Sequence, residues 1–235
     1  LPLLLLGTVL TGLFSVVAQI LVPLAATLAA PEKRGKVVGT VMSGLLLGIL
    51  LARTVAGGLA QLGGWRTVYW VASVMMVLMA LALWRWLPRL KQSVPLNYGQ
   101  LLGSVFSLYA RHPVLRTRAI TGSLIFANFS VLWTSMAFLL SSPEWNYSEG
   151  EIGLLGLVGA AGALAARQAG ALADKGKARL TTSIGLLILL ASWGMTALGA
   201  HSLVALIIGI ILLDLAVQGV HITNQSVIYR HMPEA

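Results

Sequence analysis

The sequence predicts an all-α membrane protein, and three observations support that fold class. Hydrophobic residues make up 57% of the 235 residues and charged residues only 10%, whereas a soluble domain carries about 25% charged residues. The mean hydropathy is +0.87. Apolar stretches recur at the length of roughly 20 residues that a helix needs to cross the hydrocarbon core of a bilayer. Most side chains are therefore expected to face lipid or other helices.

Seven apolar stretches are long enough to span a membrane as helices. They cover residues 3–29, 37–60, 67–87, 117–140, 150–169, 181–198 and 203–227. Residues typical of the ends of membrane helices close the first three stretches: Pro31 the first, Gly64 and Trp65 the second, and Trp86 the third. Tryptophan at such ends fits the aromatic belt at the membrane interface.

The distribution of Lys and Arg predicts the orientation of these helices. All of the 16 basic residues except Arg53 and Arg66 lie in, or at helix ends beside, the connections after the first, third, fifth and seventh stretches. Basic residues accumulate on the cytoplasmic side. We therefore expect the N-terminus of this chain on the outer side and its C-terminus in the cytoplasm, in a bacterial inner (plasma) membrane.

Residues 88–115 form a much longer connection than the others. Within it, apolar side chains recur at helical spacing from Tyr98 to Tyr109, which predicts an amphipathic helix on the membrane surface. Such a long central connection divides the chain into residues 1–92 with three spans, a linker at 93–115, and residues 116–235 with four spans. A single bundle with one long loop is the alternative.

The last stretch contains a stripe of polar residues. Asp214, Gln218, His221 and Gln225 follow each other at i, i+4, i+7 and i+11, which places them on one face of a helix, with Asn224 beside them. An ionisable residue in a span costs at least about 2.5 kcal/mol at the helix centre. The stripe is therefore expected to face a wet cavity or polar partners, as a substrate or proton pathway with Asp214 or His221 as the proton carrier. Interhelical packing is the alternative.

Four residues in other spans are further candidates for the pathway. Arg53 stays charged at any relevant pH, so it is expected to bind an anionic group or to pair with an acid, unless it reaches the outer interface as an anchor. Gln19, Asn128 and Trp133 are candidates for lining a cavity. For these three, ordinary helix packing is the competing interpretation.

The connection after the fifth stretch carries a recognisable motif. Residues 170–179 read GALADKGKAR, which resembles the G-x-L-a-D-r-x-G-r-[rk] loop motif of the major facilitator superfamily. The residues assigned to this conformational motif are Gly170, Asp174, Lys175, Gly176 and Arg179. The turn Gly64-Trp65-Arg66 is similar to the one that precedes family helix 6.

The helix that precedes this turn is similar to family helix 5, which carries a glycine-rich motif in efflux antiporters. Gly57 and Gly58 match the end of that motif, whereas Arg53 and Thr54 stand where it has Gly and Pro. Across the chain, the seven spans correspond to family helices 4 to 10 of twelve. The resemblance implies two six-helix bundles around a central cavity, with three helices before this segment and two after it.

The resemblance also implies an activity. A member of the drug or sugar efflux group is a non-enzymatic, proton-coupled exporter of small molecules that works by alternating access. Its partners are a small-molecule substrate, protons and the lipid bilayer; we expect a monomer that uses no cofactor and no metal. The segment on its own is expected to be inactive if the missing helices complete the cavity.

Other classes of protein fit the sequence less well. The charge of +9 would suit nucleic acid, but the basic residues form no single patch. A seven-helix receptor or photoreceptor shares the topology, yet no lysine lies within a span to form a retinal Schiff base. An intramembrane enzyme would require paired acids or a Ser–Lys arrangement, and Asp214 is the single acid in the interior of a span, since Glu151 lies at the very start of the fifth stretch. The chain has no cysteine, which excludes thiol chemistry.

Overall fold

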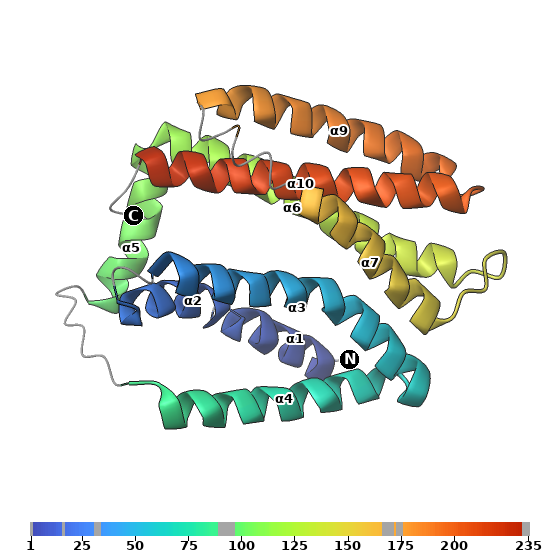
Figure 1. Cartoon of the computed structure of the whole chain (residues 1–235), viewed down its shortest axis with the longest axis horizontal. Coiled ribbons are helices and arrows are strands. Elements are labelled where there is room, and N and C mark those ends of the chain that lie inside the picture. Colours follow the sequence, from blue (N-terminus) through green and yellow to red (C-terminus); the bar gives the residue numbers. More distant parts are fainter. Residues whose placement is uncertain are drawn as a thin grey trace. The chain divides into compact units, whose positions relative to one another are not determined.

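The computed structural model describes residues 2–15, 17–30, 34–88, 97–165, 172 and 176–231. Every regular element within these ranges is a helix, so the all-α fold class is confirmed (Figure 1). The helices are α1 (Pro2–Phe14), α2 (Val17–Leu28), α3 (Arg34–Gly63), α4 (Trp65–Trp86), α5 (Tyr98–Arg111), α6 (Pro113–Leu140), α7 (Glu149–Ala165), α9 (Ala178–Leu198) and α10 (Leu203–His231).

Four helices in the described ranges are long and apolar enough to cross a membrane. They are α4, α6, α9 and the segment Leu203–Ile228 of α10. In α4 no residue is buried, and large side chains such as Trp70 and Met75 are exposed. An apolar surface of this extent is unsuited to water and suited to lipid.

The chain forms two compact units, residues 1–52 and residues 53–235. In the first unit, the single helix expected over 3–29 is divided, since α1 ends at Phe14 and α2 begins at Val17. The hydroxyl groups of Thr11 and Ser15 donate to the backbone oxygens of Gly7 and Gly12 at 2.8 and 2.7 Å. Such bonds bend a helix slightly, but the same bonds occur at Thr117 and Thr223 within the unbroken helices α6 and α10, so they do not explain why this span is divided.

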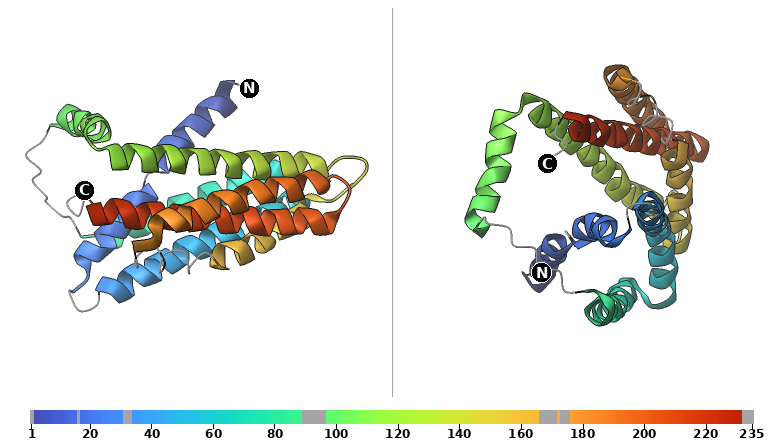
Figure 2. Two further views of the ribbon diagram at one scale, coloured as in Figure 1. Left: turned by 90° about the horizontal axis from the view of Figure 1, so that it is seen from above. Right: turned by 60° about the vertical axis from the view of Figure 1, so that its left-hand side comes forward.

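In the second unit, α10 is the central helix. It packs against α9, α7 and α6, and it runs beside α9 in all views (Figures 1 and 2). Its residues Ile210, Leu213 and Val217 have no exposed surface. A helix that is apolar on all sides belongs in the interior of a bundle, and this position brings its few polar residues into contact with three neighbours.

Local sequence signals set the ends of α6 and α7. Pro113 occupies the start of α6, where its missing N–H is not needed. Before α7, the backbone N–H of Ser148 donates to the Glu151 carboxylate at 2.8 Å, and the backbone N–H of Glu151 donates to the Ser148 hydroxyl at 3.3 Å. This reciprocal pair is a capping box, and it fixes where α7 starts on its path past α10.

Residues 98–111 of the long connection form α5, which contacts α6. The side chains of Leu102, Val105, Phe106 and Tyr109 are exposed on it. The basic residue Arg111 lies in its last turn. An exposed apolar face next to basic residues is the pattern of a helix that lies on a membrane surface.

Candidate functional site

The carboxyl group of Asp214 lies in the middle of α10, at the junction with α6 and α7. Its side chain is only 4% exposed. The indole N–H of Trp133 on α6 donates to Oδ1 of Asp214 at 3.5 Å, a long contact for a hydrogen bond of this kind. Asp214 is therefore sheltered by protein, but the hydrogen bond that holds it is weak.

Arg53 completes the site from α3, at the start of the second unit. Its guanidinium carbon lies 3.7 Å from the centre of the Trp133 ring and 5.0 Å from that of Phe129. The charges of Arg53 and Asp214 interact electrostatically. Arg53 is half-buried. Its side chain lies within the protein, on ring faces and near an acid, and does not have the arrangement of an interfacial anchor.

Three aromatic residues of α6 form what we call the aromatic ladder: Phe126, Phe129 and Trp133. Successive rings are 6.3 and 6.2 Å apart between centroids, within the range of favourable ring contacts. At the other end of the ladder, Phe126 contacts the ring of His221 edge-on at 5.2 Å. The ladder thus follows the polar stripe of α10 from Asp214 to His221.

The third wall of the site is bare helix backbone on α7. A Cβ atom added to Gly159 would collide with Oδ2 of Asp214 and lie 2.7 Å from Cζ2 of Trp133. A Cβ atom on Gly156 would lie 2.9 Å from Cβ of Arg53. Real Cβ atoms essentially never come this close to another atom, so glycine is required where α7 approaches the acid and the arginine.

A hydrogen bond also joins α3 to α7 beside the site. The hydroxyl of Thr54 donates to the backbone oxygen of Gly153 at 3.1 Å, and a Cβ atom on Gly153 would lie 2.9 Å from the backbone oxygen of Arg53. Small residues permit this kind of close helix contact in lipid. The backbone that carries Arg53 is therefore held firmly, whereas its guanidinium is held by ring contacts.

The remaining residues of the polar stripe become more exposed along α10. Gln218 and His221 are half-buried, and Gln225 is exposed. The side-chain nitrogen of Gln225 lies 3.0 Å from Nε2 of His221, a contact in which the roles depend on the imidazole tautomer. The stripe therefore runs from a sheltered acid to a histidine and an amide nearer the surface.

Asn224 belongs to a different cluster. Nη1 of Arg118 donates to Oδ1 of Asn224 at 3.2 Å and to the hydroxyl of Thr182 at 2.8 Å. In return, the amide of Asn224 donates to the backbone oxygen of Arg118 at 3.3 Å. We call Arg118, Thr182 and Asn224 the Arg118 cluster; it links α6, α9 and α10 and does not include Asp214.

Asn128 also lies outside the Asp214 site. Its amide oxygen accepts a hydrogen bond of 2.7 Å from the indole N–H of Trp193 on α9, and its amide nitrogen donates to the backbone oxygen of Leu124. The first bond joins α6 to α9, and the second lies within α6. These are contacts of ordinary helix packing.

The structure describes only part of the loop motif and only the backbone of Gln19. Gly170, Asp174 and Lys175 of the loop motif lie outside the described residues, and so does the side chain of Gln19 on α2. Gly176 has a φ of 81°, a left-handed conformation that favours glycine. Arg179 is exposed at the beginning of α9.

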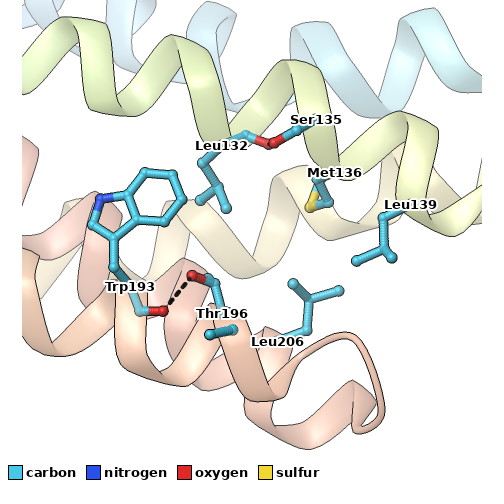
Figure 3. A pocket seen from close by; sticks show the side chains of 8 residues that line it. Leu132, Ser135, Met136, Leu139, Trp193, Thr196 and Leu206 are labelled. Atoms are coloured by element: carbon cyan, nitrogen blue, oxygen red, sulfur yellow. Dashed lines mark hydrogen bonds between the residues drawn. The ribbon is translucent and has the colours of Figure 1, made fainter.

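A cavity of about 210 Å³ lies between α6, α9 and α10, away from Asp214 (Figure 3). Its polar groups are bonded within the protein: the Ser135 hydroxyl donates to the Val131 oxygen at 2.6 Å, and the Thr196 hydroxyl donates to the Trp193 oxygen at 3.1 Å. The residues that line it are otherwise apolar, including Met136 and Leu206. It offers a ligand no charge, and its two hydroxyl protons are already donated within the protein, so we do not assign the functional site there.

Sequence reasoning missed several residues of these clusters. The spacing of Phe126, Phe129 and Trp133, at i, i+3 and i+7, was a signal for an aromatic face on α6. Arg118 was counted only as a charge at a helix end. Nothing in the sequence distinguished Gly159 from the other glycines, because its importance comes from the neighbouring helices.

Comparison with known proteins agrees with this architecture. The model of the Major Facilitator Superfamily matches residues 1–235. The "Uncharacterized transporter YgaY" of Escherichia coli O157:H7 is 71% identical over the whole of this chain, which covers 60% of that protein. The "Probable transporter SCO4007" of Streptomyces coelicolor is 34% identical over 90% of this chain and 50% of its own length. No solved structure is significantly similar.

The chain thus spans 60% of the length of the YgaY protein. The family match extends over the entire chain, and the helices, the apolar surfaces and the sheltered polar stripe are those of a multi-pass membrane protein. The chain belongs to the Major Facilitator Superfamily.

Proposed function

We propose that the whole protein is a secondary active transporter that exports small molecules by alternating access, driven by protons, in the bacterial inner (plasma) membrane. The family membership and the transporter names of its relatives support the class. In this proposal the protein acts as a monomer, with residues 93–115 linking two bundles formed in part by residues 1–92 and 116–235. The C-terminus of this chain lies in the cytoplasm and its N-terminus on the outer side.

The observation that carries proton coupling is the arrangement around Asp214. A carboxyl group that is 4% exposed within a membrane helix is costly unless it is paired or takes up a proton. Arg53 provides the charge that interacts with it. When Asp214 is ionised, Arg53 is attracted to it; when Asp214 binds a proton, that attraction is lost. Proton binding is thereby linked to the position of Arg53.

Such a link is what a proton-driven transporter requires. A ligand shifts a conformational equilibrium only if it binds one state better than the other. Because α3, α6, α7 and α10 all contribute to the site, a change in the attraction between Arg53 and Asp214 favours one arrangement of these helices over another. His221, at the other end of the aromatic ladder, is a second protonatable group through which the proton reaches or leaves Asp214.

Everted membrane vesicles that contain the complete protein test this proposal. A pH-sensitive dye inside acidified vesicles should report proton release when members of a panel of small organic cations, anions and neutral molecules are added. The Asp214→Asn variant is expected to lose at least about 90% of the signal. The matched control is Glu144→Gln, which changes an exposed acid outside the helices and should behave as wild type.

An unchanged proton signal from correctly inserted Asp214→Asn would remove Asp214 from the coupling mechanism. A panel that gives no signal with the wild-type protein, in vesicles where its insertion is verified, would count against proton-driven export of these classes. The amount of inserted protein is measured in the same vesicles.

A further inference from the structure

A planar cation of the protein itself, the guanidinium group of Arg53, occupies the space beside Asp214. The guanidinium group of Arg53 lies over the faces of Trp133 and Phe129, at 3.7 and 5.0 Å from the ring centres. Ring faces carry partial negative charge and attract cations within about 6 Å. The sheltered carboxyl group of Asp214 adds a counter-charge. These are the contacts by which a protein recognises a free organic cation.

The guanidinium is held in a way that permits exchange. Arg118, elsewhere in the bundle, donates two side-chain hydrogen bonds at 2.8 and 3.2 Å. For the Arg53 guanidinium, no hydrogen bond is found among the described residues; ring contacts and charge attraction hold it. Arginine has a long side chain with considerable rotamer freedom. The guanidinium can therefore leave while the backbone of Arg53 stays fixed against α7.

The surroundings favour a cationic ligand over an anionic one. An anion that entered to meet Arg53 would also face the carboxylate of Asp214 and the electron-rich ring faces of the ladder. A planar cation would meet the same rings and the same carboxylate as Arg53 does. On α7, Gly156 and Gly159 lie too close to Arg53, Trp133 and Asp214 to carry a side chain, so the room for a flat group is the space that the guanidinium of Arg53 leaves when it moves away.

We propose that the Arg53–Trp133–Asp214 site binds planar organic cations of delocalised charge, and that Arg53 is an internal competitor that occupies the site when no substrate is bound. This inference rests on the proposed function, because it names the substrate class of the same site. Arg53 returns as the substrate leaves, so that Asp214 is not left as an unpaired buried charge.

Three probes of nearly identical shape test the proposal: benzamidinium, benzamide and benzoate, which carry one positive charge, no charge and one negative charge. Their binding to the complete protein in detergent is measured by equilibrium dialysis, without any pH gradient. Benzamidinium is expected to bind at least about threefold more tightly than benzamide, since a cation over aromatic rings gains roughly 0.5–2 kcal/mol. Benzoate should bind most weakly.

The sharper test is the sign of the effect at position 53. The Arg53→Met variant keeps an unbranched stem but removes the competitor, so benzamidinium should bind more tightly, by about tenfold if Arg53 fills the site nine-tenths of the time. Asp214→Asn should weaken benzamidinium binding by about tenfold, which corresponds to the loss of about 1.4 kcal/mol. Arg66→Met is the matched control: Arg66 also lies over a tryptophan, Trp65, at 4.8 Å, and its replacement should change nothing.

Two results would overturn the proposal. The first is that benzoate binds to the wild-type protein more tightly than the other two probes. The second is that Arg53→Met leaves benzamidinium binding unchanged or makes it weaker. If the variant does not fold, the order of the three probes in the wild-type protein still decides. Because the dialysis uses no gradient, its result is independent of proton coupling. If the vesicle assay fails and the dialysis shows the expected binding, the cation site stands without proton-driven export. If the vesicle assay succeeds and the dialysis does not show that binding, only this substrate class is rejected.

Discussion

Two arginine sites on the same helix bundle differ in how they hold their charge. At Asp214 on α10, Arg53 lies on aromatic rings, and the nearest hydrogen bond, from Trp133, is 3.5 Å long. In the Arg118 cluster, Arg118 and Asn224 bond to each other in both directions, and Thr182 adds a bond of 2.8 Å.

The difference separates a site that can change from one that holds the bundle together. The Arg118 cluster has no carboxyl group among its three members, and its reciprocal hydrogen bonds give Arg118 a single favoured position. The Asp214 site contains opposite charges that are attracted without being locked by short bonds. Its arrangement therefore depends on whether the acid carries a proton, and that dependence is what coupled transport uses.

The largest effect is expected from Gly159→Ala. The new methyl group would collide with the Asp214 carboxyl and the Trp133 ring, and overpacking of this kind costs about 1–3 kcal/mol. Transport by the complete protein should fall at least about tenfold. Transport in vesicles and the thermal unfolding midpoint in detergent measure the two consequences.

Gly194→Ala on α9 is the control for this substitution, because a Cβ atom there meets nothing within 4 Å. It should retain wild-type transport and thermal stability. Equal behaviour of the two alanine variants would show that α7 does not need a bare backbone at Gly159, and the proposed site would lose one of its walls.

The second prediction contrasts the two sites in stability. Asn224→Ala leaves Arg118 without its buried partner and should lower the free energy of unfolding by about 1 kcal/mol, the usual scale of interhelical hydrogen bonds in membranes. Asp214→Asn removes a buried charge, and half-buried Arg53 keeps its ring contacts without it, so the free energy of unfolding should fall less than it does in Asn224→Ala. Denaturant or thermal unfolding in detergent distinguishes them, and a greater loss from Asp214→Asn would reverse the roles assigned to the sites.

The smallest effects concern the two indole N–H groups. Trp193→Phe removes a 2.7 Å hydrogen bond to Asn128 and should cost about 0.6 kcal/mol. Trp133→Phe removes only the 3.5 Å contact with Asp214 and keeps a ring face for Arg53, so its cost should be smaller still. Unfolding measurements on both variants test the order, and a larger loss from Trp133→Phe would mean that the indole holds Asp214 firmly.

The membrane helices and the main candidate residues could be predicted from the sequence. Apolar length and interfacial residues located spans that became α4, α6, α9 and α10, and the loop motif indicated the family. The exception was the first span, for which hydropathy predicted one helix over 3–29, whereas α1 ends at Phe14 and α2 begins at Val17.

The grouping of the candidates was less predictable. The spacing on α10 placed Asp214 and Asn224 near each other along one helix, but they belong to separate clusters because different neighbours face them. Asn128 was predicted as a candidate for the pathway, yet its amide bonds to Trp193. Arg53 and Trp133 are 80 positions apart in the sequence, and no local sequence pattern predicts that the guanidinium stacks on the indole ring.

By itself, the sequence determined that this chain is made of membrane helices, which of its polar residues must be sheltered, and which family it belongs to. The first two follow from the cost of placing charge and unpaired backbone groups in hydrocarbon, which depends on residue type and position along the helix; the family followed from the loop motif at 170–179. Only the tertiary structure decided that Asp214 contacts Trp133 beside the bare backbone of Gly159, and that Trp133 carries the guanidinium of Arg53 on its ring face. Those contacts depend on which helix faces pack together, and a helix can present the same residues to several different neighbours.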